Sequence, residues 1–236
     1  MTERIVAVET SSAWTSVALA DDGVVRAYAE HHDPRGHVEA IGVLVASTIV
    51  PVLEGGVPVT GVVCGVGPGP YSGLRVGVSY ARALARGWTV PVVGVCSLDA
   101  VATTQRSTGT FLVTADARRR EVYWAVYGTE GHRTSGPLVA DPATLPGDLP
   151  VVDRHATARD LIATLDAWGA LAPATWSPAP LDLELDDHGD AGARTARALV
   201  GRTLLPAEPL YLRSADITMP ARGTSSHPVS AGVTWT

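Results

Sequence analysis

A hinge rich in glycine and proline is the first stretch of this sequence with residue types suited to ligand chemistry. It follows a short apolar run that predicts a buried strand, and it precedes a predicted helix. Glycine backbones can wrap a phosphate, but a Walker-type loop also needs lysine, and all 18 basic residues of the chain are arginine. The dinucleotide fingerprint fails too, because Gly67, Gly69 and Gly73 are spaced as GxGxxxG.

The same hinge is better interpreted as a tight turn between a strand and a helix. Pro68 and Pro70 lack backbone N–H groups and so remove two donors that a phosphate cradle would use. Ser72 is predicted to cap a helix that starts near Gly73. Phosphate binding at this helix N-terminus is the weaker alternative. The structural motif comprises Gly67, Pro68, Gly69, Ser72 and Gly73.

Two further polar clusters could hold a ligand. His31, His32 and His37 could bind a metal ion, but they lack HExxH spacing and flank a Pro-Gly loop, which favours a surface loop. Asp116 precedes three arginines, at positions 118–120. This cluster is either a solvated turn or a contact for a nucleotide, an RNA or an acidic protein surface, and the sequence leaves that choice open.

The helix predicted over residues 73–88 is apolar on two sides when its residues are placed at 100° intervals. One face carries Leu74, Val78, Ala81 and Ala85, the opposite face carries Val76, Tyr80, Ala83 and Gly87, and Arg75, Arg82 and Arg86 form a row between them. A surface helix of a monomer needs only one apolar face, because only one side meets its own core. The second face therefore indicates a partner.

A second predicted helix, over residues 36–54, is also too apolar for a helix with a single covered side. Pro51 should end or kink it, and Gly55 and Gly56 should stop it. The predicted partner interface comprises Val38, Ile41, Val45, Arg75, Val76, Tyr80, Arg82 and Ala83. The alternative is that both helices are sandwiched inside a monomer.

Composition limits the classes of function. The chain has 236 residues, a net charge of −6 and 46% hydrophobic residues, which is typical of a soluble globular protein and argues against general binding of nucleic acid or membranes. Without lysine, Schiff-base chemistry is excluded. No secretion signal and no apolar run long enough to cross a bilayer is visible, so we expect a cytoplasmic protein.

The order of predicted elements is β-β-β-α-β-α-β-α over the first 104 residues, with an antiparallel meander followed by parallel strands. A second sheet is predicted to start at Phe111, and further helices are predicted over 157–168 and 189–204. We therefore predict an N-terminal lobe over 1–104, a C-terminal lobe over 105–213 and, from its Ser-, Gly- and Pro-rich composition, a disordered tail over 214–236.

Five motifs in this order and spacing resemble those of the bacterial TsaB (YeaZ) family. They are Glu9-Thr10-Ser11, the GPGPYSGLR segment over 67–75, Ser97-Leu98, the DARRREVY segment over 116–123 and the PLYLR segment over 209–213. The resemblance spans roughly residues 3–213, and the glycine-proline element is its most specific part. It implies the actin, sugar-kinase and Hsp70-like α/β superfold, built from two tandem ribonuclease-H-like lobes with mixed sheets.

The resemblance also implies a function. TsaB-like proteins are accessory subunits in the synthesis of threonylcarbamoyladenosine beside the anticodon of tRNA. They heterodimerise through N-terminal helices with the catalytic paralogue TsaD, and the ATPase TsaE joins the complex. Such a subunit has no catalytic, cofactor or metal residues of its own, since ATP and metal bind the partner subunits, and it meets tRNA only through the complex. Whether the free chain homodimerises through the same patch is left open.

The residues themselves support a non-catalytic subunit. Active members of the superfold carry Asp after the first strand, where this chain has Glu9, and an Asp-x-Gly turn where it has Asp116-Ala117-Arg118. The main alternative is a small-molecule kinase or ATPase of the same superfold, which the missing lysine and the missing Asp-x-Gly turn disfavour. A zinc peptidase lacks any ligand motif.

Overall fold

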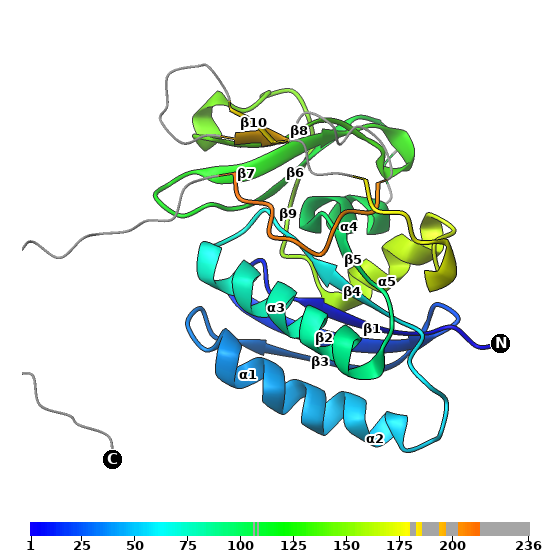
Figure 1. Cartoon of the computed structure of the whole chain (residues 1–236). Coiled ribbons are helices and arrows are strands. Elements are labelled where there is room, and N and C mark those ends of the chain that lie inside the picture. Colours follow the sequence, from blue (N-terminus) through cyan, green and yellow to red (C-terminus); the bar gives the residue numbers. More distant parts are fainter. Residues whose placement is uncertain (106, 108, 180–182, 186–193, 197–202, 213–236) are drawn as a thin grey trace, which may run out of the picture.

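The computed structural model describes residues 1–105, 107, 109–179, 183–185, 194–196 and 203–212. Its two principal sheets belong to two lobes, which lie one above the other in Figure 1. The chain thus has the two-lobed α/β architecture of the actin, sugar-kinase and Hsp70-like superfold, as the sequence predicted.

The first sheet has five strands in the order β3-β2-β1-β4-β5. Its strands are β1 (Arg4–Glu9), β2 (Trp14–Asp21), β3 (Val24–His32), β4 (Gly61–Gly65) and β5 (Val92–Val95). β1 pairs antiparallel with β2 and parallel with β4, which confirms the predicted meander followed by parallel strands. Asp22 and Gly23 have φ values of 48° and 80°, the left-handed pair that a two-residue hairpin turn requires.

The second sheet has the order β8-β7-β6-β9. Its strands are β6 (Phe111–Asp116), β7 (Val122–Tyr127), β8 (Arg133–Ala140) and β9 (Val151–Asp153). β6 pairs antiparallel with β7 and parallel with β9, which repeats the pairing of β1 with β2 and β4 in the first sheet. The two lobes are therefore built on the same strand plan, and β1 and β6 hold equivalent central positions.

Helices cover both faces of the first sheet. All six residues of β1 are buried, and since successive side chains point to opposite faces, both faces must be covered. α3 (Tyr71–Trp88) packs on β4 and β1, α1 (His37–Leu44) packs on β2, and α5 (Ala158–Ala167) packs on β1, β2 and α4 (Ser97–Thr104). Figure 1 shows α1 and α3 in front of this sheet and α5 behind it. α5 thus returns from the second half of the sequence, and the boundary at 104–105 stays a prediction.

The helix predicted over 36–54 is continuous from α1 through η1 (Val45–Ile49), a π-helical turn, into α2 (Val50–Leu53). Pro51 cannot donate a backbone hydrogen bond to the preceding turn, and the wider π-helical turn lies directly before it. Ser47 Oγ also donates to the carbonyl of Val43 at 2.8 Å. Pro51 therefore distorts the helix without ending it, and the helix stops before Gly56, whose φ is 79°.

Two local predictions are wrong. Ser72 does not cap α3: the helix begins at Tyr71 after Pro70, without a capping side chain, and Ser72 is exposed. Pro70 is fixed in an extended conformation with ψ of 134°, and this sets the start of the helix two residues early.

The helix predicted over 189–204 is also wrong where the structure describes it, because β11 (Arg194–Ala196) pairs there with β10 (Leu183–Leu185). The predicted tail over 214–236 lies outside the described residues.

The segment after residue 203 crosses back to the first lobe. Leu205 forms an antiparallel bridge with Gly94 of β5, and the Leu210 N–H donates to the carbonyl of Val66 at 2.7 Å. Tyr211 then stacks on Tyr71 with ring centroids 4.6 Å apart. This crossing brings residues 209–212 against the hinge and the start of α3. No helix in the described part of the chain is long and apolar enough to span a membrane.

Candidate functional site

The glycine-proline hinge is a closely packed turn between β4 and α3. Gly67 has φ of 94°, a conformation that glycine adopts without steric cost. A Cβ at Gly69 would lie 2.2 Å from the backbone oxygen of Ser11, so no side chain fits there. Tyr123 Oη in β7 donates to the carbonyl of Gly69 at 3.4 Å, which ties the hinge to the second lobe. Close backbone packing at Gly67 and Gly69 is what the interpretation of the hinge as a tight turn predicts.

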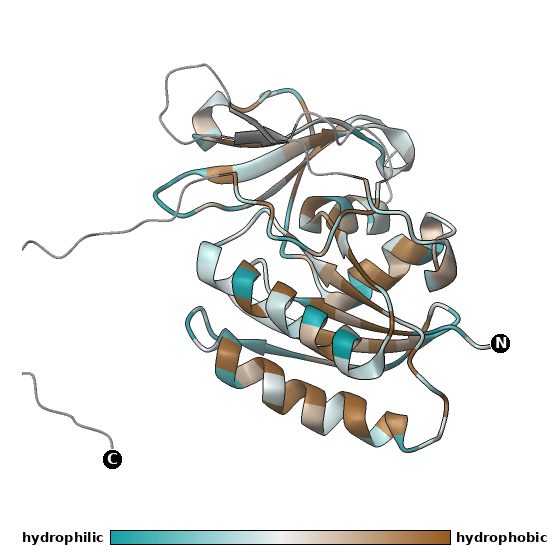
Figure 2. Ribbon diagram, viewed as in Figure 1, coloured by the Kyte–Doolittle hydropathy of each residue, from teal (hydrophilic) through white to brown (hydrophobic). Residues whose placement is uncertain are grey.

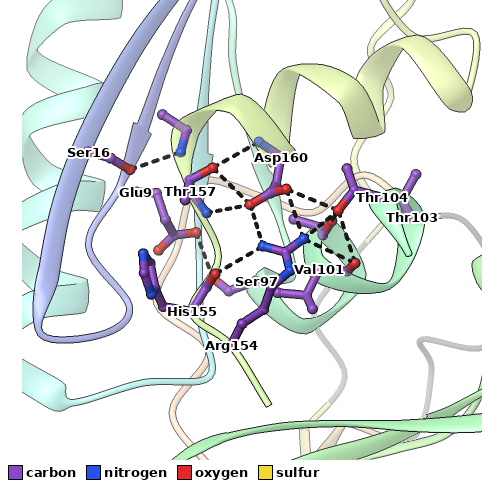
Figure 3. Close-up of polar contacts among 12 residues, drawn as sticks. Glu9, Ser16, Ser97, Val101, Thr103, Thr104, Arg154, His155, Thr157 and Asp160 are labelled. Carbon is purple, nitrogen blue, oxygen red and sulfur yellow. Dashed lines mark hydrogen bonds and ion pairs between the residues drawn. The ribbon is translucent and has the colours of Figure 1, made fainter. Parts of the chain in front are cut away.

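Glu9 occupies the end of β1, where active members of the superfold carry Asp. Its side chain is buried, and its Oε1 accepts from the Ser11 N–H at 2.6 Å while its Oε2 accepts from Ser97 Oγ at 2.9 Å. Ser97 Oγ in turn accepts from the Gly67 N–H at 3.2 Å. A Cβ at Gly65 would lie 1.7 Å from Glu9 Oε2. The carboxyl group therefore fills the space beside the hinge and accepts a hydrogen bond on each oxygen, of which Figure 3 shows the one from Ser97.

A Ser directly after a strand is typical of a helix cap, but α4 begins at Ser97 itself, without a capping side chain, and the hydroxyl of Ser97 bonds to Glu9. Residues 9 and 97 lie 88 positions apart, and no local pattern pairs them. A Ser directly after a strand was the only sequence signal for this contact.

Burial raises the pKa of Glu9, although hydrogen bonds from Ser11 and Ser97 favour the ionised form and limit the rise. Between the ordinary carboxyl pKa and this raised value, the folded chain holds more protons than the unfolded chain. Its free energy of unfolding therefore falls as pH rises through that window.

We expect Glu9→Gln to remove this pH dependence. The free energy of unfolding of the variant, minus that of the wild type, should increase as the pH is raised from about 4 towards 8. Urea unfolding at a series of pH values measures it. Glu39→Gln, at an exposed carboxylate on α1, is the matched control and should give a flat difference. A flat or falling difference for Glu9→Gln would contradict the assignment.

A cleft of about 300 Å³ lies between the two lobes, in front of the hinge. Its lining comes from the β1–β2 turn, the start of α3, the β6–β7 turn and the segment after β9: Ser11, Ser12, Ala13, Trp14, Pro70, Ala115, Asp116, Arg118, Asp153, Arg154 and His155. Trp14 stacks on His155 with ring centroids 4.9 Å apart. Much of the polar lining is already paired within the chain, which limits what the cleft can offer a ligand.

Asp116 is one such paired group. Its Oδ1 accepts from the Arg118 N–H at 2.8 Å, within its own turn. Arg118 stands where the superfold's Asp-x-Gly turn has glycine, and its φ of 60° keeps the left-handed conformation. Arg119 and Arg120 share that conformation, with φ of 55° and 66°, and all three side chains are exposed. Whether they form a solvated turn or contact an anion stays open.

Arg154 is held between the lobes (Figure 3). Its two terminal nitrogens each lie 2.9 Å from an oxygen of Asp160, and it also contacts Thr104 at the end of α4. Asp160 completes a capping box with Thr157 at the start of α5. A guanidinium used in this way joins β9, α4 and α5, so Arg154 acts mainly as a structural link.

The histidine cluster does not converge. His37 is buried and its Nδ1 lies 2.7 Å from Thr15 Oγ1, whereas His31 and His32 are exposed on β3. Among the described residues, no group of three or more His, Cys, Asp or Glu side chains could hold a metal ion. His31 and His32 thus end β3 and His37 begins α1, on either side of the Pro-Gly loop.

The helix over residues 37–53, one of the two predicted to face a partner, is exposed along one side. Val38, Val43 and Val50 have 65%, 66% and 45% of their surface accessible, and Ala46 between them is exposed. We call these four residues the outer face. Glu39 is the one charged side chain on the outside of residues 37–53. Figure 2 shows α1 and α2 as mostly hydrophobic.

Part of the predicted interface is wrong. Ile41 and Val45 are only 1% and 5% exposed and belong to the chain's own core, so they cannot line a surface patch. The core-facing row is Ile41, Val45 and Ile49, at i, i+4 and i+8, and Val38 lies outside it. Val38 therefore belongs to the exposed face of the helix, whereas Ile41 and Val45 belong to the adjacent buried face.

On α3, the predicted interface residues divide into two groups. Arg75, Arg82 and Ala83 are exposed, whereas Val76 and Tyr80 are half-buried and pack against the core. The predicted core face of Leu74, Val78, Ala81 and Ala85 is confirmed. The second apolar face of α3 is thus partly used inside the monomer, as the sandwiched alternative proposed, and the open apolar surface lies on α1.

The comparisons with known proteins agree with this geometry. The sequence model of the family described as TsaD, tRNA N6-adenosine threonylcarbamoyltransferase, matches residues 23–159, which is more than half of the chain. An uncharacterised protein of Mycobacterium leprae is 44% identical over 110 residues, covering 47% of this chain and 30% of that protein. The tRNA threonylcarbamoyladenosine biosynthesis protein TsaB of Escherichia coli is 37% identical over 127 residues, covering 52% and 54%.

A solved structure, YeaZ from Pseudomonas aeruginosa, matches with a TM-score of 0.56 and 24% identity, covering 72% of this chain and 92% of that one. At this identity the match concerns the fold alone. The chain spans about half the length, or less, of the curated relatives that it matches.

Proposed function

The chain belongs to the family of the tRNA N6-adenosine threonylcarbamoyltransferase TsaD and, within it, to the TsaB (YeaZ) proteins, and on this premise we propose that it is a non-catalytic subunit of a tRNA-modifying complex. It pairs with the catalytic TsaD subunit and activates it for transfer of threonylcarbamoyl to the adenosine beside the anticodon. TsaE joins the complex, and ATP and metal bind the partner subunits. This chain has no cofactor of its own in the proposal and meets tRNA through the complex.

The outer face of α1 and α2 is the observation that carries the proposal. Val38, Val43 and Val50 are each about half exposed or more, on a helix with a single outward charge. Scattered surface valines are ordinary, but apolar residues gathered on one side of a helix, with a single charge among them, are typical of protein–protein contacts. Because α1 and α3 lie in contact, the outer face and the exposed side of α3 together form a two-helix surface for docking.

The state of Glu9 supports a non-catalytic role. A carboxylate that positions metal or phosphate must be ionised and open to the ligand. Glu9 is instead buried, bonded on both oxygens and shifted to a raised pKa, which favours its neutral form. The second carboxylate of the superfold site, Asp116, is bonded to its own turn. The proposal therefore assigns the chemistry to TsaD.

Val43→Asp tests the proposal. A charge at the centre of the outer face should weaken pairing with TsaD from the same genome by about tenfold or more, because it must be desolvated in the interface. The variant should still fold, since Val43 is 66% exposed. Co-purification with light scattering measures the stoichiometry, and titration calorimetry measures the affinity. Tyr80→Asp is a poorer choice, because the half-buried ring packs against the core.

Val24→Asp is the matched control. Val24 is 54% exposed and lies at the β2–β3 hairpin, outside α1, η1 and α2, so pairing should be unchanged. Wild-type protein that forms no one-to-one complex with TsaD would contradict the proposal. Steady ATP hydrolysis by the isolated chain would favour the kinase or ATPase alternative, whose ligand would have to enter the cleft between the lobes.

A further inference from the structure

The flank of α3 that faces away from α1 carries two unpaired positive charges. Gly73 lies against α1, since a Cβ there would be 3.2 Å from Nε2 of His37. Arg82 and Arg86 lie at i+9 and i+13 from Gly73, which is roughly 180° and 140° around the helix. Neither arginine has an ion-pair or hydrogen-bond partner among the described residues. Both guanidinium groups are therefore available to an anionic group of another molecule.

Nothing on α3 itself balances this charge. Residues 71–88 include no Asp or Glu. Arg86 lies in the last turn, where the helix dipole favours a cation, but Arg82 lies a turn earlier. Two arginines at i and i+4 also repel each other, which slightly opposes helix formation. An anion bound between them would relieve that repulsion.

A groove of about 850 Å³ lies beside these arginines, between the C-terminal half of α3 and β5. The two guanidinium groups stand on its α3 side, and its apolar lining includes Ala85, Val90 and Val92. The groove therefore combines an apolar surface with a pair of cations along one side. It lies across α3 from the outer face.

β5 is an edge strand, and part of its edge is unpaired. The carbonyl of Pro91 points to β4, where it accepts from the Val62 N–H at 3.0 Å. Gly94 points the other way and exchanges two hydrogen bonds with Leu205, at 2.7 and 2.9 Å. Because alternate residues of a strand point the same way, the N–H and C=O of Val92 also point outwards. Neither forms a hydrogen bond with a described residue.

The chain's own cover of this edge stops before it reaches Val92. Continued antiparallel pairing from Leu205 would place residue 207 opposite Val92. Instead, the carbonyl of Pro206 accepts from the Glu208 N–H at 2.8 Å, which closes a tight turn. Leu210 already lies beside Val66, past the other end of the strands. The edge at Val92 is thus left open next to the groove.

From these features we infer that the groove binds a short, extended segment of another protein that carries acidic side chains at alternate positions. The segment pairs with the N–H and C=O of Val92 as a strand added to the sheet edge, and its carboxylates on the α3 side pair with Arg82 and Arg86. Side chains two residues apart on a strand point to one face at about 7 Å spacing, close to the roughly 6 Å between positions i and i+4 of a helix.

A nucleic acid fits this site less well. Phosphates would pair with the guanidinium groups but would leave the N–H and C=O of Val92 without a complementary backbone. The chain as a whole also carries a net charge of −6, which opposes a polyanion more than a short peptide. The site lies across α3 from the outer face, so it goes beyond pairing with TsaD and does not depend on it.

The test is an NMR titration of the full, ¹⁵N-labelled chain with a capped peptide of about seven residues in which Glu alternates with Val. We expect the peptide to shift the amide signals of Val90 and Val92 and to slow solvent exchange of the Val92 N–H. A matched peptide with Lys in place of Glu should bind about tenfold more weakly. N-methylation of the central Val, which removes a backbone donor without changing charge, should weaken binding about fivefold.

Two protein variants locate the site. Arg82→Ala/Arg86→Ala should bind the Glu peptide about tenfold more weakly than the wild type, and it should still fold because both side chains are exposed. Arg119→Ala/Arg120→Ala removes the same charge from the exposed β6–β7 turn and should bind as the wild type does. Equal affinity for the two variants, or signal shifts that leave out Val92, would overturn the inference.

Two further outcomes would name a different occupant and so overturn it as well. A single-stranded RNA of similar length that shifts the same signals and binds more tightly than the Glu peptide would make this a nucleic-acid site. Shifts of Val90 and Val92 with protein concentration alone, without peptide, would mean that a second copy of the chain covers the groove. Each outcome is read from the same spectra, independently of any complex with TsaD.

Discussion

Arg133→Met is expected to lower the free energy of unfolding by about 3–5 kcal/mol, since removing one member of a buried ion pair leaves the other charge buried and uncompensated. Single domains are stable by only about 5–15 kcal/mol, so this one substitution would remove a large share of the total. The variant should unfold at a much lower urea concentration than the wild type.

The reason lies in the surroundings of Arg133 in β8. Its side chain is 1% exposed, and its Nη2 lies 3.1 Å from Oδ2 of Asp99 in α4. Tyr127 in β7 donates to the other oxygen of Asp99 at 2.7 Å. Burial lowers the pKa of Arg133, but Asp99, Cys96 and Tyr127 together raise it by more, so the guanidinium stays charged. The cluster joins α4 to two strands of the second sheet.

Two comparisons make the prediction sharp. Arg26→Met breaks an exposed pair with Asp21, at 3.4 Å and with 52% of the arginine side chain accessible, and should cost less than about 1 kcal/mol. Arg133→Met/Asp99→Leu removes both charges and should be less destabilised than Arg133→Met alone. If Arg133→Met were no more destabilised than Arg26→Met, the buried cluster would not stabilise the contact between α4 and the second sheet.

The order of strands and helices along the first lobe was predictable because its signals are local. The run from Arg4 to Glu9 is short and apolar, Asp22-Gly23 is a hairpin turn, and the hinge separates a strand from a helix. In each case, the residues that set the structure are neighbours in the sequence. Periodicity likewise gave the core face of α3, because its amphipathic pattern is undisturbed over 18 residues.

The errors arise where a distant contact or a missing donor decides the structure. Ser97 looks like a helix cap, but its hydroxyl donates to the buried carboxyl group of Glu9, which lies 88 residues away in the sequence. Pro51 was expected to end or kink its helix, but the helix does not end there, and a π-helical turn precedes the proline. Ile41 was assigned to the partner surface because a helical wheel shows which residues share a side, but not which side meets the sheet.

The contact between α3 and the β1–β2 turn is also hidden from local patterns, and it carries the second large prediction. Gly77→Ala is expected to lower the free energy of unfolding by about 2–3 kcal/mol, the usual cost of overpacking. A Cβ at Gly77 would lie 2.1 Å from Thr10 Oγ1, and that hydroxyl donates to the carbonyl of Gly73 at 2.8 Å. α3 must therefore move away from β1, and the partner surface moves with it.

Two opposing effects decide the size and sign of this change. Alanine is the better helix former by about 1 kcal/mol, so Gly87→Ala on the same helix, with no atom within 4 Å of its Cβ, should stabilise the chain. At Gly77 the clash outweighs that gain.

Thr10→Ala alone should cost about 1 kcal/mol for its lost hydrogen bond. In Gly77→Ala/Thr10→Ala the clashing oxygen is gone, so the double variant should be more stable than Gly77→Ala, with a coupling of about 2 kcal/mol in urea unfolding. The prediction would be wrong if the two losses were additive, or if Gly77→Ala were as stable as Gly87→Ala. Close packing of α3 against Thr10 would then not depend on glycine at position 77.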